Sequence, residues 1–101
     1  MGCGQKDAAD READIQCIIE KLEKNKIALR LVNHYSDLAD IVENERLTFK
    51  ERQEVAFIME RVASVISNII DVKGGRLDYF VPDAVESYIK THMKEKYFHV
   101  D

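Results

Sequence analysis

The strongest constraint on the fold is a helical repeat of apolar residues in the third quarter of the chain. They recur at alternating steps of three and four residues, at Val55, Ile58, Val62, Val65, Ile69 and Val72. Three more apolar residues widen this stripe, namely Met59, Ile66 and Ile70. An amphipathic helix has this period, whereas a half-buried strand alternates at every second residue. We therefore expect a helix whose apolar face contacts two neighbouring elements.

Local signals mark both ends of this helix. Thr48 and Glu51 have the spacing of a capping box, in which each side chain accepts a hydrogen bond from the other residue's backbone amide. Residues 73–75, Lys-Gly-Gly, predict the helix end, with a cation in the last turn and a glycine as left-handed cap. We then expect a linker over residues 76–81 and a last helix that begins at Pro82.

The first half of the chain carries two overlapping apolar stripes. One comprises Ile15, Ile18, Leu22, Leu29, Val32 and Ala39, and the other Ile27, Leu31, Tyr35, Leu38 and Val42. Either one long helix rotates its apolar face, or a break near residues 33–36 starts a second helix capped by Ser36 or Asp37. We favour the break. Asn25 interrupts the first stripe, and we interpret it as a polar residue that sets the helix register.

The expected architecture is all-α. Short connections between amphipathic helices favour antiparallel neighbours, so we predict an antiparallel bundle of three to four helices. Residues 1–9 lack apolar periodicity and are expected to form a flexible N-terminal tether. Residues 10–101 then form a single helical bundle domain, which is close to the commonest domain size.

The head of the chain places Cys3 between two glycines, ahead of the polar tether. Gly2-Cys3-Gly4 resembles the end of a bacterial lipobox, where a small residue precedes the cysteine that receives the lipid. That resemblance implies lipid attachment at Cys3 and a periplasmic or outer-membrane lipoprotein. The eukaryotic alternative is dual acylation of Gly2 and Cys3, but Lys6 stands where that motif takes Ser or Thr. The third interpretation is an unmodified chain end on a cytoplasmic protein.

The other candidate ligands do not form a convincing site. Cys3 and Cys17 lack the close spacing of zinc or redox motifs. A disulfide between them would pin the tether to the first helix, and we favour a packing role for Cys17 instead. His92, Glu95 and His99 have a helical spacing that suits one metal ion, but neighbouring lysines add positive charge. We predict no metal and no cofactor.

Composition and motifs argue against several function classes. The net charge of −4 provides no basic patch for nucleic acid. A phosphate-binding glycine loop and a serine-nucleophile elbow are both absent from the sequence. The carboxylates are scattered along polar helix faces, so we do not expect an enzyme.

The leading functional hypothesis is a non-enzymatic helical protein-binding module, anchored by a lipid on Cys3, with an inhibitory, immunity, exclusion or assembly role. Tyr97 and Phe98 are the candidate partner-binding residues, because aromatic side chains often anchor interfaces. One alternative is a cytoplasmic homodimeric adaptor or regulator that associates through residues 55–72. The other is a small-ligand sensor or enzyme that uses the bundle core.

Overall fold

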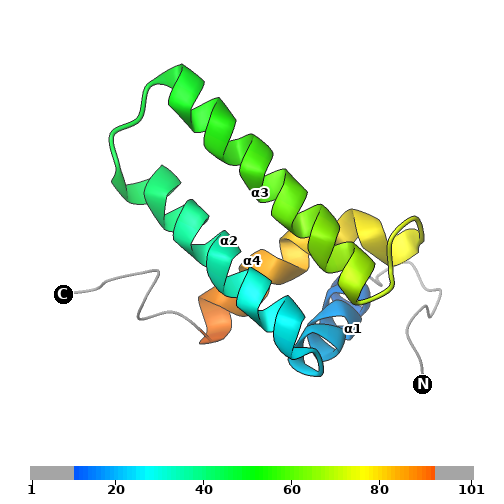
Figure 1. The fold of residues 1–101 in the computed structure, drawn as a ribbon. Helices are drawn as coiled ribbons and strands as arrows, with labels where there is room; N and C mark the ends of the chain where they lie inside the picture. Colours follow the sequence, from blue (N-terminus) through cyan, green and yellow to red (C-terminus); the bar gives the residue numbers. More distant parts are fainter. Residues whose placement is uncertain (1–10, 93–101) are drawn as a thin grey trace.

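The computed structural model describes residues 11–92 of the 101-residue chain. These residues form four α-helices and one short 3-10 helix (Figure 1). In chain order the elements are α1 (Arg11–Glu23), α2 (Lys26–Asn44), α3 (Phe49–Ile69), η1 (Arg76–Phe80) and α4 (Val81–His92). Residues 11–92 contain no strand, so the predicted all-α bundle is confirmed.

The two longest helices, α2 and α3, form an antiparallel hairpin (Figure 1). Helices α1 and α4 pack against each other and against the hairpin near its base, where α2 begins and α3 ends. The tip of the hairpin, at residues 45–48, extends beyond α1 and α4 (Figure 1). The hydrophobic core therefore lies at the base, and the tip is a two-helix projection.

All four helices contribute fully buried side chains to the core. They are Ile18 and Leu22 of α1, Ala28 and Val32 of α2, Ile66 of α3, and Val81, Ala84, Val85 and Ile89 of α4. Burying a valine, leucine or isoleucine side chain contributes about 1.5–3 kcal/mol relative to leaving it in water. Phe80 and Tyr88 are partly buried and pack against this cluster.

The boundary between α1 and α2 differs from the predicted break. Asn25 is the N-cap of α2, and its Oδ1 accepts hydrogen bonds from the amides of Ile27 and Ala28, each at 3.0 Å. The helix then continues without interruption through residues 33–36, and Ser36 is a buried residue in its middle. The register role for Asn25 and the cap role for Ser36 or Asp37 were therefore wrong. The cause is that an asparagine side chain can satisfy two otherwise unpaired amides at a helix start.

The start of α3 confirms the capping box. The Glu51 amide donates to Thr48 Oγ1 at 3.1 Å, and the Thr48 amide donates to Glu51 Oε1 at 3.0 Å. These two bonds fix the chain where it leaves the hairpin tip and enters α3.

The end of α3 falls before the predicted Lys-Gly-Gly stop. The helix ends at Ile69, and Asp71 takes a left-handed conformation with φ of 61°. The Val72 amide donates a hydrogen bond to the Ser67 carbonyl at 2.9 Å. The Asp71 amide donates one to the Asn68 carbonyl at 3.2 Å. These are the two hydrogen bonds of a Schellman motif. Asp71 therefore takes the left-handed position after the helix end that glycine usually occupies. Gly74, with φ of 82°, shapes the following turn instead.

The predicted linker at 76–81 is also more ordered than expected. Residues 76–80 form η1, and Val81 begins α4 one residue before Pro82. Val81 is fully buried, which explains why this short segment has a fixed conformation. Within residues 11–92, no helix combines the length and the apolar character needed to cross a bilayer.

Candidate functional site

Three of the predicted site residues lie outside the described part of the chain. They are Cys3, the expected lipid-attachment residue, and Tyr97 and Phe98, the expected partner-binding residues. Those assignments stay predictions. Of the metal candidates, only His92 is described, and its ring stacks on Tyr88 with 4.2 Å between ring centroids. Residues 11–92 hold no group of three or more side chains with the chemistry and spacing of a metal site.

Cys17 occupies a packed position on α1, as expected from its place in the apolar stripe. Its side chain is buried beside Ile18 and Ile19. The sulfur is disulfide-bonded, so the expectation of an unbonded packing residue was wrong. A buried cysteine tolerates either state sterically, and the apolar period of the sequence does not distinguish them.

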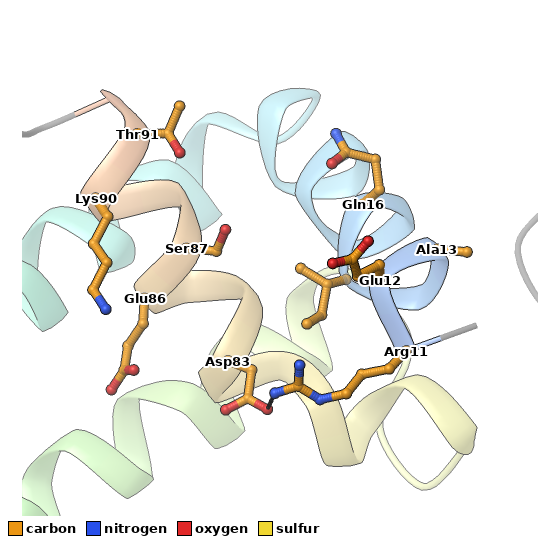
Figure 2. Close-up of a pocket in the computed structure, with 10 residues that line it drawn as sticks. Arg11, Glu12, Ala13, Gln16, Asp83, Glu86, Ser87, Lys90 and Thr91 are labelled. Carbon is orange, nitrogen blue, oxygen red and sulfur yellow. Dashed lines mark hydrogen bonds and ion pairs between the residues drawn. The ribbon is translucent and has the colours of Figure 1, made fainter. Parts of the chain in front are cut away.

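An open cleft of about 720 Å³ lies between α1 and α4 (Figure 2). The ion pair between Arg11 and Asp83, at 2.9 Å, spans one end of it. Glu12 and Ser87 extend from the two helices into the space between them (Figure 2). A serine nucleophile needs a base within hydrogen-bond reach, and Ser87 has no such bond within residues 11–92. The cleft is polar and open, and its side chains form no catalytic set.

A second polar cluster fixes the loop between α3 and η1. Lys73 Nζ lies 2.6 Å from Ser64 Oγ, and the Gly74 amide donates to Asp78 Oδ2 at 3.0 Å. The Gly74 hydrogen bond, a hydrogen bond from Ser67 and the Lys73 charge lower the pKa of Asp78 from its ordinary 3.8. A catalytic serine–lysine pair requires a desolvated lysine, whereas this pair lies at the surface. These bonds therefore serve to hold the loop.

The most unusual surface lies on the α2–α3 hairpin. Four large aliphatic side chains are exposed there: Ile27 and Ile41 on α2, at 60% and 36%, and Ile58 and Val65 on α3, at 42% and 45%. Multiples of seven residues separate the two members on each helix, so each pair lies along one line of its helix. We call the surface formed by these four residues the outer face.

Helix geometry places both lines on the same side of the hairpin. At about 100° per residue, Ile27 and Ile41 point away from buried Val32, and Ile58 and Val65 point away from buried Ala63. Because the helices are antiparallel, we infer from these angles that the two lines flank the groove where α2 meets α3. Partly buried Leu31 and Ile69 continue this apolar surface.

The sequence predicted the breadth of the apolar stripe on α3 but not the exposure of its outer-face residues. The breadth of the 55–72 stripe predicted contact with two neighbours, and α3 does pack against both α2 and α4. Ile58 and Val65 were assigned to the same seam as Val62, yet Val62 is buried and the other two are exposed. The sequence signal that could have indicated this exposure is the width of the 55–72 stripe, which is greater than two neighbouring helices can cover.

Comparison with known proteins gave no relative from which to infer a function. No family model matches the chain. No curated protein and no solved structure matches it significantly. Functional inference therefore depends on the surfaces described above.

Proposed function

We propose that this protein is a non-enzymatic binding module that contacts another protein chain through the outer face. The observation that carries the proposal is the exposure of Ile27, Ile41, Ile58 and Val65 on one side of the hairpin. Single exposed aliphatic residues are ordinary on protein surfaces, but several of them on one helical hairpin form a candidate interaction site.

The energetics favour covering this surface. Full burial of one such side chain contributes about 1.5–3 kcal/mol, and each of these four retains a third or more of its exposure. A partner helix that lies along the groove would contact both lines at once, which is the helix-in-groove mode of recognition. The cleft between α1 and α4 offers no comparable apolar anchor, because its lining is mostly polar or charged.

Site-specific photo-crosslinking tests the proposal. A photoreactive amino acid replaces Ile58 on the outer face or, as the matched control, Glu86 beside the α1–α4 cleft. The two variants are produced in the cells that naturally make the protein, and their covalent products are identified by mass spectrometry. We expect a protein adduct at position 58 that Ile27→Glu in the same chain removes. A protein adduct at position 86 and none at position 58 would overturn the proposal.

The lipid anchor at Cys3 is the second part of the proposal, supported by the resemblance of Gly2-Cys3-Gly4 to a lipobox. A lipid on Cys3 would hold the module at a membrane surface and so determine where it meets its partner. A cysteine whose sulfur carries a lipid cannot also form a disulfide, and Cys3 and Cys17 are the two cysteines of the chain. The lipid-anchored form of the protein is therefore an alternative to the form described above, in which Cys17 is disulfide-bonded.

Intact mass therefore tests the anchor directly. Protein from its natural host should carry the mass of an acyl-modified cysteine, and Cys17 should then react as a thiol after denaturation. An unmodified mass with a disulfide between Cys3 and Cys17 would exclude the anchor while leaving the outer-face proposal intact.

A further inference from the structure

We propose that the chain bound by the outer face is a second copy of this protein, docked so that the two α2 helices run antiparallel. This inference depends on the proposed binding role of the outer face and names its partner. It is carried by the distribution of charge along α2, which is separate from the apolar observation.

Charge on α2 is segregated by sign along the helix. Its first half, residues 26–34, carries Lys26, Arg30 and His34 and no carboxylate. Its second half, together with the C-cap, carries four carboxylates and no basic residue: Asp37, Asp40, Glu43 and Glu45. Two such helices side by side and antiparallel bring basic halves against acidic halves at both ends.

The same charges are unfavourable for α2 in isolation. The helix has no acidic residue in its first turn and no basic residue in its last turn. Its cations instead lie near the positive end of the helix dipole, and its carboxylates lie near the negative end. An antiparallel second copy places carboxylates beside Lys26 and Arg30 and cations beside Asp37 and Glu45, which share the side of α2 that carries Ile41. The charge distribution that is unfavourable for a single α2 helix is thus compensated by opposite charges at a two-fold interface.

The apolar residues of α2 fit the same symmetry. Ile27 lies seven residues before His34, and Ile41 lies seven residues after it. If two α2 helices cross at His34, Ile27 of each copy lies beside Ile41 of the other. This contact is isologous and closes on itself, as expected for a symmetric dimer. Ile58 and Val65, across the groove on α3, then border the same interface.

Charge reversal at the two ends of α2 tests this arrangement independently of the apolar contacts. One variant of the full chain carries Lys26→Glu and Arg30→Glu, and the other carries Asp37→Lys and Glu45→Lys. Sedimentation equilibrium measures the self-association of the wild type, of each variant and of their equimolar mixture. Lys21→Glu with Lys90→Glu, on α1 and α4, is the control with the same change in net charge as the first variant.

We expect the wild type to dimerise and each variant to associate at least about tenfold more weakly, because like charges then face each other. The mixture should regain association, and the control should dimerise like the wild type. At a protein concentration low enough for both to be monomeric, the first variant should also unfold at a temperature no lower than the wild type, since glutamates suit the start of a helix. That result separates a lost interface from a damaged fold.

Two outcomes would overturn the inference. One is a wild type that stays monomeric at every concentration, and the other is a mixture that associates no better than its components. If position 58 still crosslinks to a different protein in the host, the binding module stands and only the second copy is excluded. If position 58 yields no adduct, the proposed function itself fails.

Discussion

The two ends of the α2–α3 hairpin have the same apolar periodicity and different environments. At the base, Val32 of α2 and Ile66 of α3 are fully buried, because α1 and α4 cover them. Toward the tip, Ile58 of the same apolar stripe of α3 is 42% exposed. The comparison shows that periodicity indicates which side of a helix is apolar, whereas the neighbouring elements decide how much of it is buried. Apolar residues that no element covers contribute little to folding and are available for binding.

The largest effect expected from this contrast is on stability. Ile66→Ala at the base should lower the free energy of unfolding by about 2–5 kcal/mol, because it leaves a cavity among residues that cannot collapse into it. Ile58→Ala on the outer face should cost less than about 1 kcal/mol in the monomer, since the side chain is already partly in water. Urea unfolding at low protein concentration measures both. Equal losses would contradict the distinction between core and outer face.

The second prediction concerns the buried carboxylate that joins α1 to η1. Asp14 is 2% exposed, and its Oδ2 accepts from Arg76 Nε at 3.0 Å. Arg76→Ala leaves this buried charge without that partner and should cost about 1–3 kcal/mol, less than a fully buried pair because Arg76 is half exposed. The matched control is Arg11→Ala in the exposed Arg11–Asp83 pair, which should cost less than about 1 kcal/mol. Thermal unfolding of both variants checks this, and a larger loss for Arg11→Ala would refute the assignment.

A smaller change is expected at the end of α3, where Asp71 has φ of 61°. Asp71→Gly should raise the free energy of unfolding by about 0.5–1 kcal/mol, because glycine adopts the left-handed conformation without steric cost. Gly74→Ala, at φ of 82°, is the opposing control and should lower stability. Chemical denaturation measures both variants. If Asp71→Gly destabilises the protein, the Schellman assignment is wrong.

The smallest expected effect is the pH dependence contributed by Asp78. Its pKa is lowered by the Gly74 amide, the Ser67 hydroxyl and Lys73, so the folded state holds the proton less tightly than the unfolded state does. The resulting stabilisation is complete above the unfolded pKa, near 3.8, and is lost as the pH falls through the lower folded value. Asp78→Asn should flatten this acid limb in urea-unfolding midpoints measured across pH. An unchanged acid limb would show that Asp78 does not contribute.

Local signals in the sequence predicted much of the helical architecture. The three-four period predicted α3, and the spacing of Thr48 and Glu51 predicted its first cap, because both depend on residues close in the chain. Asn25 was misinterpreted, since an asparagine serves equally as a buried polar residue or as a helix cap. Asp71 was overlooked because Gly74 and Gly75 are better left-handed candidates on intrinsic preference alone.

Features that depend on contacts between residues distant in the chain could not be predicted from the sequence. Nothing near Asp14 indicates that its carboxylate pairs with Arg76, which lies 62 residues away in the sequence. The exposure of Ile58 and Val65 depends on which side of α3 its neighbours α2 and α4 cover, and the period of α3 does not encode that side. The charge segregation of α2 was readable in the sequence, but it acquired meaning only when residues 26–44 proved to be one uninterrupted helix.

The most direct test of the central claim compares two exposed residues by sedimentation equilibrium. Ile58 belongs to the outer face, whereas Tyr79 on η1 is 82% exposed and lies outside it. Our account predicts that the wild type and Tyr79→Glu form dimers of equal affinity, while Ile58→Glu is folded and monomeric. A monomeric wild type, or a dimer that Ile58→Glu leaves intact, would contradict self-association through the outer face.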